Sequence, residues 1–99
     1  MHARVSTFES SPVGLRESEE AFRTEMVPQV LGIDGCRGVI SLVDYDSGKS
    51  IAVTLWESEE ALQASEELAN QIRSEAAEAS SGQIAGVDRY EVSILELPE

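Results

Sequence analysis

The feature that most constrains the fold is a pair of strand-like segments whose side chains are apolar on both faces. Residues 39–45 and 51–56 are rich in β-branched side chains, and residues 46–49 between them are typical of a hairpin turn in which Gly48 takes a positive φ. Alternate residues of a strand point to opposite faces of a sheet, yet both sets are apolar here. Because a one-sided antiparallel sheet alternates apolar and polar residues, we expect both faces to be covered.

Two further strands are expected at the ends of the chain. Residues 3–9 alternate in part and predict a first strand, and residues 87–97 predict the last one. Together with the central hairpin they give four strands, and the segments between them are long enough for helices.

Both connecting segments have helical patterns. In the first, apolar residues recur at helical spacing from Leu15, and we expect a helix that begins near Pro12, is bent or ended by Pro28, and stops at Gly32. The second is expected over residues 58–79, with the Ser58 hydroxyl capping its first turn.

The order β-α-β-β-α-β predicts an α+β, ferredoxin-like fold in a single domain over residues 1–99. It consists of a four-stranded antiparallel sheet with two helices on one face. Two such helices leave the other sheet face as an apolar patch larger than monomers tolerate. We therefore predict a homodimer that packs through the sheet face. The alternative is a monomer whose outer face carries ordinary scattered apolar residues.

The charge excludes two classes of partner. The chain has 7 basic and 19 acidic residues, a net charge of −12, and would repel both a nucleic-acid backbone and an anionic membrane surface. Half of that charge lies in residues 57–78, which points to a solubility coat on the second helix and a partner-facing surface nearly free of charge. The chain has no apolar run that could span a bilayer and no signal-peptide pattern, so we expect a cytoplasmic protein with no membrane partner.

Scarce residues exclude most catalytic machinery. His2 and Cys36 are the sole histidine and cysteine, so a zinc site or a histidine-based triad is not expected. Cys36 either packs as an inert strand residue or is an activated thiol beside Arg37; the inert role is favoured.

Three segments resemble the antibiotic biosynthesis monooxygenase (ABM) superfamily: residues 33–38, 46–49 and 54–62, the last containing Trp-Glu-Ser-Glu-Glu-Ala. The resemblance implies a dimeric α+β barrel. It also implies a pocket between helices and sheet for a small aromatic ligand, and oxygenase chemistry with O₂ that needs no metal or flavin. Trp56 matches the tryptophan that lines such pockets, whereas Ala52 and Leu62 fall where an asparagine and a tyrosine are usual. The heme-degrading branch holds iron through a second-helix histidine, which this chain lacks.

The candidate pocket residues are Trp56, Phe22, Met26 and Tyr90, each with an alternative role in the core or, for Tyr90, at the dimer face. We expect no metal and no cofactor. Two functions remain open. The favoured one is non-catalytic binding of a small molecule by a domain that kept the barrel and lost the chemistry. The alternative is a cofactor-independent monooxygenase acting on an aromatic or polyketide-like compound.

Overall fold

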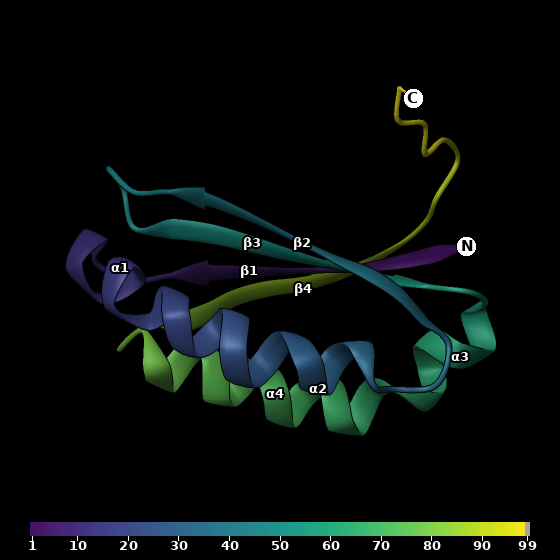
Figure 1. Cartoon of the computed structure of the whole chain (residues 1–99), viewed down its shortest axis with the longest axis horizontal. Coiled ribbons are helices and arrows are strands. Elements are labelled where there is room, and N and C mark those ends of the chain that lie inside the picture. Colours follow the sequence, from purple (N-terminus) through teal and green to yellow (C-terminus); the bar gives the residue numbers. More distant parts are fainter. Residues whose placement is uncertain (99) are drawn as a thin grey trace.

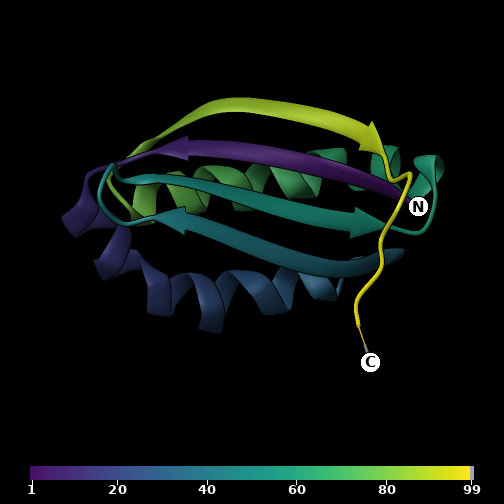
Figure 2. The ribbon, with the colours of Figure 1, turned by 90° about the horizontal axis from the view of Figure 1, so that it is seen from above.

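The four strands form one antiparallel sheet. The computed structural model describes residues 1–98. Its strands lie in the order β2-β3-β1-β4 (Figure 2), and they are β1 (His2–Glu9), β2 (Cys36–Asp44), β3 (Lys49–Trp56) and β4 (Gln83–Glu91). All helices lie on one face of this sheet (Figure 1). The predicted α+β, ferredoxin-like fold is confirmed.

The first helical segment is continuous but changes its winding. The helix α1 (Pro12–Ala21) begins at Ser11, whose side chain accepts a hydrogen bond from the Gly14 backbone N–H at 2.9 Å. It passes through a π-helical turn, η1 (Phe22–Met26), into α2 (Val27–Leu31). Pro28 lacks the N–H that an α-helix needs, and a widened turn just before it accommodates that loss.

The second helical segment is broken once. It consists of α3 (Glu59–Ala64) and α4 (Glu66–Ala79), separated by Ser65. The Leu62 carbonyl accepts hydrogen bonds from the side chains of Arg4 and Ser65, both at 2.8 Å, and such side-chain insertion interrupts a helical ladder. The predicted cap is confirmed, since the Ser58 hydroxyl accepts from the Ala61 N–H at 3.1 Å.

The predicted span of the last strand is wrong at both ends. β4 occupies Gln83–Glu91 rather than residues 87–97. The reason is its partner: Glu91 pairs with His2, the first residue of β1, and the Val92 N–H donates to the Met1 carbonyl at 2.9 Å. β1 begins at His2, and the apolar residues that follow Val92 form a tail outside the sheet (Figure 1).

The strand register sorts the side chains into two faces. On the face away from the helices, three rows cross the sheet from β2 through β3 and β1 to β4: Gly38–Leu55–Ala3–Tyr90, Ile40–Val53–Val5–Asp88 and Leu42–Ile51–Thr7–Gly86. Asp88 is the one charged residue among these twelve positions. A fourth row at the hairpin end, Asp44–Lys49–Glu9–Gln83, is charged and polar, so the outer face is apolar over the first three rows only, where the two-sided strand pattern predicts it.

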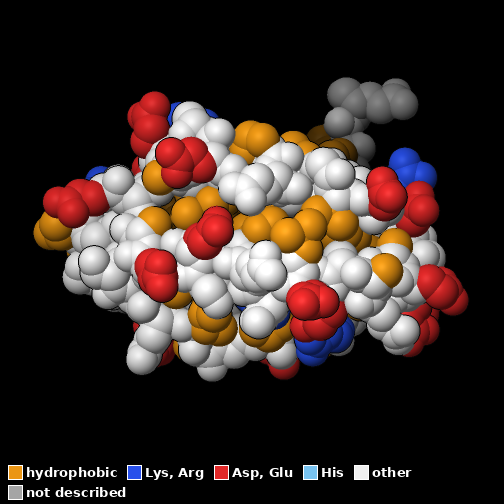
Figure 3. Space-filling view, turned by 90° about the horizontal axis from the view of Figure 1, so that it is seen from below, with side chains coloured by type: hydrophobic (Ala, Val, Ile, Leu, Met, Phe, Trp, Pro, Cys, Tyr) orange, Lys and Arg blue, Asp and Glu red, His pale blue; other side chains and the backbone are white. Residues whose placement is uncertain are grey.

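The opposite face packs against the helices. Its core cluster consists of Met26, Val30 and Ile72, with partly buried neighbours that include Phe22 and Val39. Seen from the helical side, hydrophobic side chains gather along the middle of the molecule and acidic ones surround them (Figure 3). Within residues 1–98, none of the helices has both the length and the apolar character needed to cross a membrane.

Candidate functional site

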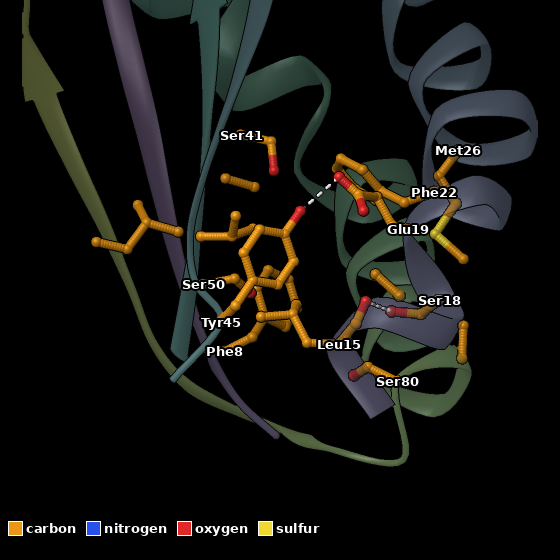
Figure 4. Close-up of a pocket in the computed structure, with 15 residues that line it drawn as sticks. Phe8, Leu15, Ser18, Glu19, Phe22, Met26, Ser41, Tyr45, Ser50 and Ser80 are labelled. Carbon is orange, nitrogen blue, oxygen red and sulfur yellow. Dashed lines mark hydrogen bonds between the residues drawn. The ribbon is translucent and has the colours of Figure 1, made fainter. Parts of the chain in front are cut away.

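A hollow lies between the helices and the sheet at the hairpin end of the molecule (Figure 4). We call it the hairpin cavity; its empty volume is about 580 Å³ with its open mouth included. Phe8, Leu15, Phe22 and Met26 give it an apolar wall, and the remaining lining is Ser18, Glu19, Ser41, Val43, Tyr45, Ser50, Ile51, Ala52, Ala76, Ala79 and Ser80.

Tyr45 connects the two walls of the hairpin cavity. It follows the end of β2 and reaches α1, where its hydroxyl donates to the Glu19 carboxylate at 2.6 Å (Figure 4). The Arg16 guanidinium lies 4.4 Å from the centre of the Tyr45 ring, in the geometry of a cation–π contact. The hydrogen bond to Glu19 raises the pKa of Tyr45 above its usual value, because ionising the phenol would break that bond.

A second hollow continues under the sheet toward α3. We call it the arginine cavity; it has an empty volume of about 490 Å³, again with its mouth. It shares four lining residues with the hairpin cavity, namely Phe8, Phe22, Ala52 and Ala76, so the two hollows adjoin. The rest of its lining is apolar apart from Arg4, Ser6, Thr54, Trp56 and Arg73.

Trp56 forms part of the wall of the arginine cavity. The side chain is fully buried, and its indole N–H donates to the Thr54 hydroxyl at 2.9 Å. The Arg4 guanidinium carbon lies 5.4 Å from the Trp56 ring centre. The tryptophan is thus both part of the core and part of the cavity wall.

Three arginines surround one carboxylate beside this cavity. The Arg4 Nη2 lies 2.8 Å from a Glu66 oxygen, Arg73 lies 3.6 Å from the other oxygen, and Arg89 also pairs with it. Arg4 is 1% exposed and Arg73 is 8% exposed. Nη2 of Arg4 also donates to the Leu62 carbonyl and the Ser65 hydroxyl.

This cluster moves the pKa values of its members. Burial lowers the pKa of Arg4 below its usual value, although Glu66 partly offsets the change. Burial also lowers the pKa of Arg73, and repulsion from Arg4 adds to that effect. Burial alone would raise the pKa of Glu66, but hydrogen bonds and attraction from Arg89 and Arg4 outweigh it, so the pKa lies below its ordinary value of 4.5.

The four pocket residues predicted from the sequence lie in three places. Phe22 lines both cavities, Met26 lines the hairpin cavity, and Trp56 lines the arginine cavity. Tyr90 lines neither of these two cavities; it lies on the outer face of β4 with 57% of its surface exposed. This position agrees with its alternative role at a dimer face, while a ligand contact for any of the four stays a prediction.

Sequence reasoning missed the arginine cluster. The glutamates of the second helix were expected to form a solvated face, and for Glu66 that is wrong, because it is the shared partner of three arginines. One signal existed: Arg4 occupies a strand position in phase with Phe8, whose side chain is buried.

The other two candidate residues, Cys36 and Arg37, line neither cavity. Cys36 is half-buried against the core cluster, and its thiol lies 3.8 Å from the Gly38 carbonyl. Arg37 pairs with Glu57 at the surface, at 3.4 Å. Across residues 1–98, no three histidine, cysteine or acidic side chains gather as a metal-binding group.

Solved structures of known proteins share this architecture. A Deinococcus radiodurans protein assigned as an antibiotic biosynthesis monooxygenase aligns with a TM-score of 0.71 at 15% identity, over 100% of this chain and 99% of its own. The Streptomyces coelicolor monooxygenase from the gene ActVA-Orf6, solved with Nanaomycin D, aligns with a TM-score of 0.69 at 19% identity, over 99% and 92%. The chain therefore has the fold of the antibiotic biosynthesis monooxygenase-like proteins, and the fold resemblance predicted from its sequence is confirmed.

Relatives by sequence come from Mycobacterium tuberculosis. Uncharacterized protein MT2635 (strain CDC 1551 / Oshkosh) is 37% identical over 95 residues, which are 96% of this chain and 40% of that protein. Uncharacterized protein Rv2557 (strain H37Rv) is 35% identical, over 96% and 42%. The chain thus spans about two fifths of the length of these curated relatives. No family model matches the chain.

Proposed function

We propose that this protein binds a small, largely apolar molecule between its helices and its sheet, without chemistry of its own. The observation that carries the proposal is the pair of adjoining cavities, whose shared wall of Phe8, Phe22, Ala52 and Ala76 is apolar. The hairpin cavity is open to solvent at its mouth, which gives a small molecule a way into this apolar space.

A binding role is favoured over oxygenase chemistry by two positions. The resemblance to the ABM superfamily places polar pocket residues at positions 52 and 62, where this chain has Ala52 and Leu62. Ala52 lines both cavities with a methyl group, and Leu62 is 3% exposed and lines neither. The monooxygenase remains the second candidate, supported by the fold that the chain shares with such enzymes.

Filling the shared wall should weaken ligand binding. We expect the neutral fluorophore N-phenyl-1-naphthylamine to bind the unmodified protein, and Ala76→Leu to weaken its affinity by about tenfold because the added side chain takes up cavity space. The matched control is Ala64→Leu, an equal change at an exposed position of α3. Fluorescence titration measures both affinities.

Two results would contradict this role. Equal affinity of the Ala76→Leu and Ala64→Leu variants would place the fluorophore outside the cavities. Consumption of O₂ with aromatic dihydroxy compounds, in the absence of added metal or flavin, would contradict non-catalytic binding and support the monooxygenase function. In that case the loss of O₂ consumption in Ala76→Leu would assign the reaction to the cavities.

The functional form is proposed to be a homodimer that packs through the outer face of the sheet. Ile40 and Leu42 on that face are 42% and 51% exposed in the single chain, and Tyr90 is 57% exposed. The tail after β4 rises on the same side (Figure 1) and adds the exposed side chains of Ile94 and Leu97. Exposed apolar side chains gathered on one face favour association with a second copy. The cytoplasmic location stays a prediction.

A charge on the outer face should separate the two copies. We expect a mass near twice 10.7 kDa for the unmodified protein, and Ile40→Asp to weaken the dimer by ~100-fold or more, because each copy would bury an unpaired carboxylate. Val13→Asp, on the helical side at 63% exposure, is the control and should leave the dimer intact. Sedimentation over a concentration series measures this, and a 10.7 kDa species for the unmodified protein would contradict the dimer.

A further inference from the structure

The arginine cluster carries more positive charge than its one carboxylate balances. Arg4, Arg73 and Arg89 are three of the seven basic residues of a chain whose net charge is −12, and all three converge on Glu66. With all four groups ionised, the cluster holds two unbalanced positive charges. An acidic chain has many carboxylates to place beside them, yet Glu66 is the one acidic partner these arginines have within residues 1–98.

The two buried arginines also have hydrogen-bond donors to spare. Nε and Nη1 of Arg4, and Nε and Nη1 of Arg73, are buried and have no hydrogen-bond partner within the described chain. Asn70 accepts from Nη2 of Arg73 at 3.2 Å and does not relieve these four nitrogens. Buried polar groups are almost always paired, and a set of four unpaired donors on two adjacent cations calls for an acceptor that carries negative charge.

The lining of the arginine cavity indicates the chemistry of the rest of the ligand. Arg4 and Arg73 both line the arginine cavity, and beyond Ser6 and Thr54 its wall is built of apolar side chains such as Val30 and Ile72. The hollow adjoins the hairpin cavity across Phe22, which is apolar as well. A bare inorganic anion would leave those walls without a partner. An anionic head with an apolar body satisfies both parts of the lining.

We propose that the arginine cavity is a carboxylate site, and that the ligand of this protein is a carboxylic acid with an apolar body. The proposal rests on the binding function argued above and adds the chemical class of the ligand. The carboxylate lies against Arg4 and Arg73, whose planar guanidinium groups match the two oxygens of a carboxylate. The body extends past Trp56 and Phe22 toward the hairpin cavity.

The test compares two probes that differ only in charge, 4-phenylbutanoate and 4-phenylbutanamide. Trp56 is the sole tryptophan and lines the cavity, so its fluorescence reports binding, and calorimetry gives the affinities independently. We expect the acid to bind at least about tenfold more tightly than the amide, the difference that charge-assisted hydrogen bonds bring.

Three variants assign that preference to the cluster. Arg73→Gln should reduce the preference for the acid to about twofold or less, since it removes one cation. Glu66→Gln should increase the affinity for the acid about fivefold, because it removes the competing carboxylate and leaves both buried arginines in place. Arg37→Gln is the control; Arg37 is exposed, lines neither cavity and should leave the preference unchanged.

The outcomes separate this proposal from the binding function itself. Equal binding of acid and amide, or a preference that survives Arg73→Gln, would overturn the carboxylate site and leave the apolar binding function standing. Absence of binding by both probes and by N-phenyl-1-naphthylamine would overturn both. The increase expected for Glu66→Gln guards against misfolding as an explanation, since an unfolded variant would lose affinity rather than gain it.

Discussion

Glu66→Ala is expected to lower the free energy of unfolding by about 2–3 kcal/mol, because it leaves the buried Arg4 without a counter-ion. The effect falls below that of a fully buried pair, since the Glu66 side chain is 39% exposed and water screens part of the charge. Glu67→Ala is the matched control on the next residue, which is exposed, and should change stability by less than about 0.5 kcal/mol. Urea unfolding of both variants at neutral pH measures the difference.

The same contribution should disappear in acid. The folded-state pKa of Glu66 lies below its ordinary value of 4.5, so its stabilising effect is complete above that pH and is lost as the pH falls through the folded-state pKa. The stability difference between the unmodified protein and Glu66→Ala should therefore shrink toward zero in that acidic range. An undiminished difference there would mean that Glu66 stabilises the fold by packing and not by charge.

Two changes should restore part of the unfolding free energy that Glu66→Ala loses. Adding Arg4→Met to Glu66→Ala removes the orphaned cation and should restore part of the lost stability, because replacing both partners of a buried pair costs less than removing one. A carboxylate ligand should stabilise Glu66→Ala more than the unmodified protein, since it supplies the missing negative charge.

The topology could be predicted because its signals are local. The hairpin follows from residues 46–49, where Gly48 has φ +80° and a Cβ would collide with the Ser10 carbonyl. The cap at Ser58 follows from the residue type alone. The end of β4 depends instead on where β1 begins, and no pattern within residues 83–97 encodes that.

The arginine cavity could not be predicted because its parts are distant in sequence. Arg4 and Glu66 are 62 residues apart in sequence. They meet only because β1 packs against the second helical segment where it breaks at Ser65. In the sequence, residues 3–9 alternate only in part, because Phe8 is out of phase with Val5, and Arg4 lies in the phase of Phe8. In the structure the same side chain is 1% exposed and faces the helices. A charged residue in phase with a buried aromatic residue is thus the one local sign of the site.

Trp56→Ala is expected to cost about 3–5 kcal/mol of unfolding free energy, enough to threaten folding of a domain this small. The side chain is fully buried, packs under Arg4 and holds the Thr54 hydroxyl, so its removal opens a void that the surrounding strands cannot close. Trp56→Phe keeps most of the volume and should cost about 1–2 kcal/mol.

These two variants separate the roles that the sequence left open for Trp56. A side chain that served only as a ligand platform would be removable with a cost below about 1 kcal/mol and a loss confined to ligand affinity. The burial of Trp56 predicts the opposite order, a large loss of stability with Ala and a folded, ligand-binding protein with Phe. Thermal and urea unfolding measure the first, and calorimetry with 4-phenylbutanoate measures the second. If Trp56→Phe binds and keeps its preference for the acid, the arginines recognise the carboxylate. The role of Trp56 is then to pack against Arg4 and hold it in position.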